Sequence, residues 1–142
     1  MRKFLLSIPT GIPSLIITAI VAYLTLTSDP VGKEFLFFPG SDKVAHVLAF
    51  MFVSLTYLYD YAKHKNPHHT KLNLEMALTA TAIVVGLLTE AGQLVISNGR
   101  SYDPSDIVAD GIGAIIGFLA YRFYLGHEIR YFFSRRKHHH DY

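Results

Sequence analysis

The stretch TEAGQLVISNGRSYDPSDIVADGIGAIIG, residues 89–117, combines apolar flanks typical of membrane helices with an unusual density of polar side chains. These polar side chains are Glu90, Gln93, Arg100, Asp103, Asp106 and Asp110. Ionisable groups within membrane segments are rare and costly, and by default they mark functional sites. The stretch therefore predicts two membrane helices that meet around a polar site.

The overall composition also favours a membrane protein. Of the 142 residues, 51% are hydrophobic and 17% are charged, which is apolar for a water-soluble domain. The net charge of +2 is too small to indicate a nucleic-acid partner. Cysteine is absent, which excludes disulfides and thiolate metal sites.

Four apolar segments are each about long enough to cross a hydrocarbon core, which takes roughly 20 helical residues. They are residues 8–26, 44–62, 74–96 and 107–125. The first is predicted to be a retained helix, because "TLTSDP" after it lacks the small-x-small pattern of a signal-peptide cleavage site. We expect an all-α polytopic membrane protein, a single domain over residues 1–142 with a bundle of four transmembrane helices and a basic tail at 126–142.

The basic residues predict the orientation of this bundle. With the N-terminus in the cytoplasm, ten of the thirteen Lys and Arg residues lie inside, and Lys33, Lys43 and Arg100 lie outside. This distribution obeys the positive-inside rule and places both termini in the cytoplasm. The polar side chains then gather at the outer leaflet.

Helical spacing places these polar side chains on two faces. Asp103, Asp106, Asp110, Gly113 and Gly117 share a face of the fourth segment, and Thr79, Gly86, Glu90, Gln93 and Ser97 share a face of the third. We expect the two faces to meet, since small residues such as Gly113 and Gly117 let membrane helices approach closely. The same glycines would also suit a homo-oligomer contact, and the sequence leaves both partners open.

The individual side chains differ in how strongly they indicate function. Asp103 before Pro104 is typical of a helix N-cap, and Asp106 suits either the first helical turn or a site. Asp110 lies too deep for capping, and Glu90 lies about 24 Å along its helix. Both indicate either a functional site or an ion pair, and nearby carboxylates would favour the protonated form of His46.

Two blocks of sequence resemble the VanZ-like family of small polytopic bacterial membrane proteins. They are SDKVAHVLAFMFVS, residues 41–54, and the stretch 89–117. The family pattern has D-K-x-x-H, then E-x-x-Q, an Arg, and D-x-x-x-N-x-x-G-x-x-x-G. It matches Asp42, Lys43, His46, Glu90, Gln93, Arg100, Asp106, Gly113 and Gly117. Asp110 stands where the pattern has Asn, which adds an ionisable group.

The resemblance implies a protein of the bacterial cytoplasmic membrane that affects susceptibility to the glycopeptide teicoplanin through an outward-facing polar site. The site would take a lipid-linked or anionic headgroup ligand. The residues expected to bind it are Asp42, Lys43, His46, Glu90, Gln93, Arg100, Asp106 and Asp110.

A membrane-embedded enzyme acting on a lipid headgroup is the alternative. Glu90 or Asp110 would be the general base and His46 the acid, with Asp106 a further candidate, while Arg100 and Lys43 would hold a phosphate or carboxylate. One imidazole among carboxylates leaves a metal-assisted reaction open, but no H-E-x-x-H motif is present, so neither metal nor cofactor is predicted. A transporter is disfavoured, because no inverted repeat is visible.

Overall fold

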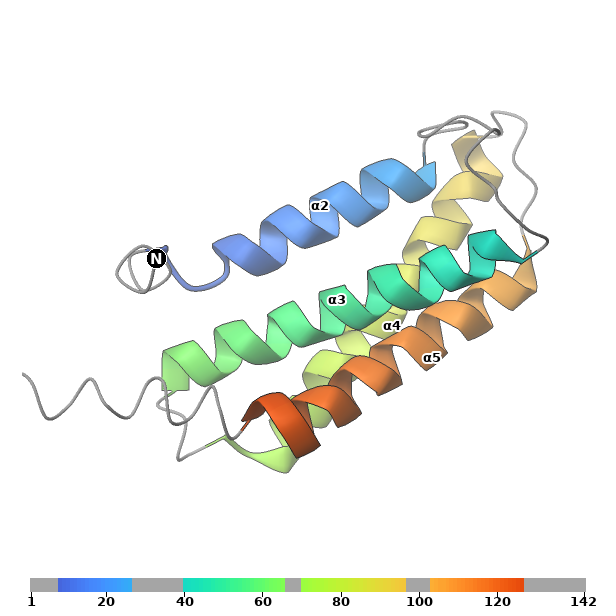
Figure 1. Cartoon of the computed structure of the whole chain (residues 1–142). Helices are drawn as coiled ribbons and strands as arrows, with labels where there is room; N and C mark the ends of the chain where they lie inside the picture. Colours follow the sequence, from blue (N-terminus) through green and yellow to red (C-terminus); the bar gives the residue numbers. More distant parts are fainter. Residues whose placement is uncertain (1–7, 27–39, 66–69, 97–102, 127–142) are drawn as a thin grey trace, which may run out of the picture.

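The computed structural model describes residues 8–26, 40–65, 70–96 and 103–126, and these form a bundle of four helices (Figure 1). The helices are α2 (Ile12–Leu26), α3 (Ser41–Lys65), α4 (Leu72–Ile96) and α5 (Pro104–Ala120), and a π-helical turn, η3 (Tyr121–Leu125), continues α5. The predicted all-α class with four apolar helices is confirmed. Arg100 and most of the predicted tail, residues 127–142, lie outside the described residues.

The first helix is shorter than predicted. It begins at Ile12 instead of residue 8, after Pro9 and after Gly11, whose φ of 91° lies in the left-handed region that side chains disfavour. Pro13 fits the first helical turn, where its missing N–H needs no partner. With 15 residues, α2 spans about 22 Å, which is less than a hydrocarbon core of about 30 Å.

The other helices begin two or three residues earlier than predicted, and each is long enough to span. The spans Ser41–His64, Leu72–Ile96 and Pro104–Leu125 have the length and apolar composition to cross a membrane. Large hydrophobic side chains such as Leu15, Leu88 and Phe123 are exposed on the outside of the bundle, while charged ones are buried inside. A water-soluble protein has the opposite arrangement, so the fold is that of a membrane protein.

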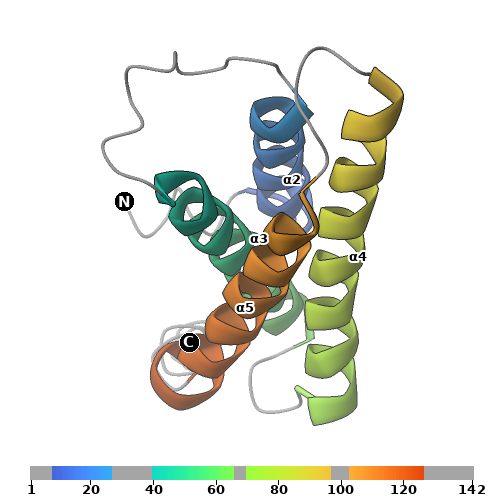
Figure 2. The ribbon, with the colours of Figure 1, turned by 90° about the vertical axis from the view of Figure 1, so that its right-hand side faces the viewer.

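The helices alternate in direction, so that the C-terminal ends of α2 and α4 lie beside the N-terminal ends of α3 and α5 (Figures 1 and 2). We call this the His46 end of the bundle, and the opposite one the Glu75 end. The polar residues of the stretch 89–117 that the structure describes lie toward the His46 end together with the start of α3, while Gly113 and Gly117 lie further along, beside Val47 and Met51.

The glycines of α5 contact α3, and the predicted contact with α4 is wrong for them. A Cβ on Gly113 would overlap the carbonyl oxygen of Val47, and one on Gly117 would lie 2.6 Å from that of Met51. The spacing of small residues identifies a contact face but not the helix that packs on it. The predicted approach of α4 occurs instead at Gly86, where a Cβ would lie 2.7 Å from Oδ2 of Asp110.

Candidate functional site

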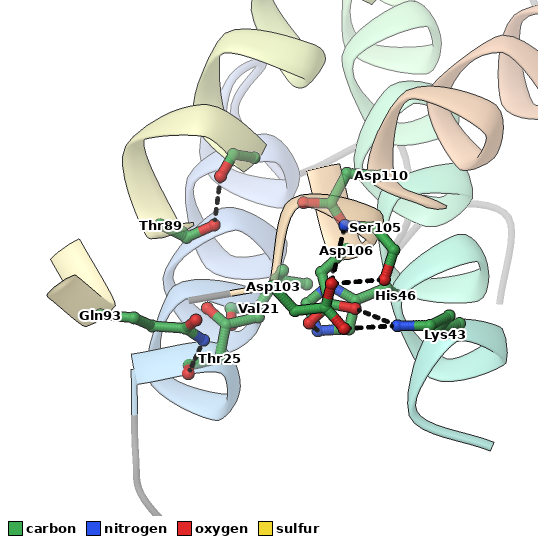
Figure 3. Close-up of polar contacts among 11 residues, drawn as sticks. Val21, Thr25, Lys43, His46, Thr89, Gln93, Asp103, Ser105, Asp106 and Asp110 are labelled. Atoms are coloured by element: carbon green, nitrogen blue, oxygen red, sulfur yellow. Dashed lines mark hydrogen bonds and ion pairs between the residues drawn. The ribbon is translucent and has the colours of Figure 1, made fainter. Parts of the chain in front are cut away.

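Lys43 joins α3 to the start of α5 at the His46 end. Its Nζ lies 2.9 Å from Oδ2 of Asp103 and 3.0 Å from Oδ1 of Asp106 (Figure 3). Asp103 is also the N-cap of α5, as predicted, and its Oδ1 accepts hydrogen bonds from the backbone N–H and the hydroxyl of Ser105. The Lys43 ammonium, together with Ser105, holds the pKa of the Asp103 carboxyl well below its usual range.

His46 lies one turn deeper on α3 and faces two carboxylates of α5. Its Nδ1 lies 2.8 Å from Oδ1 of Asp110, within hydrogen-bond distance, and its Nε2 lies 3.9 Å from Oδ2 of Asp106 (Figure 3). The imidazole therefore lies between two acidic side chains, with Nδ1 within hydrogen-bond distance of Asp110 and Nε2 near Asp106.

Glu90 completes the buried part of this arrangement from α4. One carboxylate oxygen of Glu90, one of Asp110 and a ring nitrogen of His46 all lie within 4.8 Å of one another. Glu90, Asp110 and His46 are 0%, 1% and 4% exposed. Gly86, one turn before Glu90, leaves the space that the Asp110 carboxylate occupies.

We call the whole group the His46 cluster. It comprises Asp42, Lys43, His46, Glu90, Asp103, Asp106 and Asp110, where Asp42 joins through ligand atoms within 4.8 Å of those of His46 and Asp106. In this part of the described chain, five carboxyl groups therefore meet one lysine and one histidine. The excess of negative charge favours protons and cations over anions.

Two of the predicted ligand residues are not placed in this cluster. Gln93 donates a hydrogen bond from Nε2 to the backbone oxygen of Thr25, 2.7 Å away on α2, so its described contact ties α4 to α2 (Figure 3). Arg100 was predicted to bind the ligand, and it lies outside the described residues. Lys43, predicted to bind the ligand as well, bridges two carboxylates in the structure, because it is paired with both Asp103 and Asp106.

Two buried carboxylates at the Glu75 end were missed by the sequence analysis. Glu75 of α4 lies 3.1 Å from an Arg122 nitrogen of η3, and Asp60 of α3 accepts a hydrogen bond of 3.1 Å from the backbone N–H of Ser14 in α2. The helical period could have indicated that they are buried, since Glu75 lies about four turns from Glu90 and Asp60 about four turns from His46, which places each pair on one face of its helix. Both residues lie near an end of their helix, where charged side chains are common and do not by themselves indicate a site.

The fold and the site together define a small helical membrane protein with a buried histidine–carboxylate cluster at one end. The chain belongs to the VanZ/LLP1 family, whose model matches residues 3–125. No curated protein and no solved structure matches the chain.

Proposed function

We propose that this protein acts in the bacterial cytoplasmic membrane, where the His46 end faces outward and binds the polar headgroup of a lipid-linked envelope component. Through this binding it changes susceptibility to the glycopeptide teicoplanin. The observation that carries the proposal is the burial of His46, Glu90 and Asp110 among three helices. Family membership and the distribution of basic residues support the setting and the orientation.

Burying such a cluster of ionisable side chains costs free energy. Apolar residues of similar volume often stabilise a fold as well as a buried ion pair does, so stability alone does not require these three side chains. Ionisable groups inside membrane bundles are rare outside functional sites. Lys43 is already engaged by two carboxylates, so the headgroup would be recognised through its hydroxyl or ammonium groups by the partly exposed carboxylates of the cluster, Asp42 and Asp103.

The test is to express the chain in a teicoplanin-susceptible Gram-positive host and to measure the minimal inhibitory concentration. We expect the natural chain to raise it and His46→Asn to abolish the rise. His64→Asn is the matched control, because His64 lies on the same helix, is exposed and is near the Glu75 end. An immunoblot of the membrane fraction checks that all chains are inserted. An inserted natural chain without effect would contradict the glycopeptide part of the proposal.

A second candidate, an enzyme acting on the same headgroup, is favoured by one contact. The 2.8 Å contact between His46 Nδ1 and Asp110 Oδ1 is the arrangement in which a carboxylate orients an imidazole for acid–base chemistry. The isosteric change Glu90→Gln separates the two candidates. An enzyme that uses Glu90 as its base would lose all effect on the inhibitory concentration, whereas a binding protein would keep part of it.

A further inference from the structure

We propose that His46, Glu90 and Asp110 form a binding site for one divalent transition-metal cation of the Zn²⁺ or Mn²⁺ class. Each side chain offers a ligand atom, and the three atoms lie within 4.8 Å of one another. Ligands about 2.1 Å from a tetrahedral ion are about 3.4 Å apart, so small side-chain rotations would close the site. No short sequence motif indicates this metal site, because each ligand comes from a different helix.

The charge balance supports a divalent ion at this place. Two carboxylates and a neutral imidazole carry two negative charges, which one divalent cation cancels. In a bundle with little water, a neutral assembly avoids most of the cost of burying isolated charges. One nitrogen and two oxygen donors suit a borderline ion such as Zn²⁺ or Mn²⁺.

Asp110 supplies an independent observation. Its Oδ1 contacts His46, but its Oδ2 is buried and has no hydrogen-bond partner among the residues that the structure describes. This oxygen faces α4, since it lies 2.7 Å from the position of a Cβ on Gly86. Glu90 follows one turn later among the buried residues of that helix. A buried carboxylate oxygen without a partner is unfavourable, and a cation between Asp110 and Glu90 would satisfy it.

The surroundings of His46 have the features of a second coordination shell. A histidine that binds a metal through one ring nitrogen commonly directs the other toward a carboxylate, which fixes the ring. Here Nδ1, which faces Asp110, would bind the ion, and the other ring nitrogen, Nε2, lies 3.9 Å from Asp106, which Lys43 holds in turn. Lys43 and Asp103 are about half exposed, so a series of carboxylates leads from the surface to the buried site.

The inference goes beyond the proposed function, because it concerns metal binding whether or not teicoplanin is involved. It is tested on the full chain purified in detergent, with the tail histidines His138, His139 and His140 changed to Ser to remove their metal binding. After chelation, the chain is titrated with ZnCl₂ or MnCl₂. Calorimetry gives the affinity, and mass spectrometry of the elements after desalting gives the stoichiometry.

We expect one high-affinity ion per chain, and a loss of affinity of about tenfold or more in Glu90→Gln and Asp110→Asn. The matched control is Glu75→Gln, the same change on the same helix at an equally buried position, which should bind like the parent. Absence of a bound ion in a monodisperse parent chain would overturn the inference, and so would equal binding by folded Glu90→Gln. A parent chain without a bound ion overturns the inference whether or not a variant folds.

Discussion

At the scale of single residues, buried charges in this bundle are held by partners on other helices. At the Glu75 end the two partners differ in burial, since the Glu75 side chain is 1% exposed and that of Arg122 is 40% exposed. A buried charge that loses its partner is strongly destabilising, whereas a long basic side chain near a helix end can reach the membrane surface. The two members of this pair should therefore tolerate mutation unequally.

We predict that Arg122→Gln lowers the free energy of unfolding by about 1–3 kcal/mol, less than for a fully buried pair because Arg122 is partly exposed. Glu75→Gln should have a smaller effect, and the double variant should be more stable than Arg122→Gln alone. Thermal unfolding in detergent micelles measures all three. If the double variant were no more stable than Arg122→Gln, a buried charge would not be the cause.

At the scale of helices, the close approach of α5 to α3 positions the His46 cluster. Gly113 and Gly117 bring the backbone of α5 against the carbonyl oxygens of Val47 and Met51. His46 lies one residue before Val47, so this contact sets its distance to Asp110.

We predict that Gly113→Leu destabilises the bundle by about 3 kcal/mol or more, because its side chain would meet backbone, which cannot move aside as a flexible side chain can. Gly111→Leu is the matched control on the same helix, since a Cβ there has no neighbour within 4 Å among the described residues. It should be neutral or slightly stabilising, given the better helix propensity of leucine. The measurement is the melting temperature in detergent. Similar melting temperatures for the two variants would contradict the α3–α5 contact.

The sequence predicted where the helices lie along the chain better than it predicted which helices contact each other. Apolar length predicted all four helices, and the 3.6-residue period predicted the buried face of α4 that carries Thr79, Gly86 and Glu90. It could not show that the glycines of α5 face α3, because a period identifies a face and not its partner. The start of α2 was misjudged because the apolar segment was extended across Pro9, Thr10 and Gly11 to residue 8, and the backbone is not helical there.

The candidate site was predicted only in part, again because helix contacts are not encoded locally. His46, Glu90 and Asp110 were singled out because burying ionisable side chains in a membrane bundle costs free energy, and they lie together in the structure. The pairing of Lys43 with Asp103 and Asp106 depends on the contact between α3 and α5, which no local pattern encodes. Gln93 shares the face of Glu90 but lies nearly one turn further, where Thr25 of α2 accepts its hydrogen bond.

At the scale of the whole molecule, the two ends of the bundle carry different charge. The His46 end has an excess of carboxylates, while Lys63, Lys71 and Arg122 lie toward the Glu75 end. Under the positive-inside rule the Glu75 end would be cytoplasmic and the His46 cluster would face outward. The proposed function depends on this orientation, because an envelope headgroup outside the cell could not reach a cluster on the cytoplasmic side.

Cysteine labelling in intact cells tests the orientation most directly, and the natural chain has no cysteine to give background. Ser41, at the start of α3, and Lys71, just before α4, lie at opposite ends of the bundle. We predict that Ser41→Cys reacts with a membrane-impermeant thiol reagent in intact cells, and that Lys71→Cys reacts only after the cells are lysed. Labelling of Lys71→Cys in intact cells, with Ser41→Cys protected until lysis, would place the His46 cluster in the cytoplasm and contradict the account.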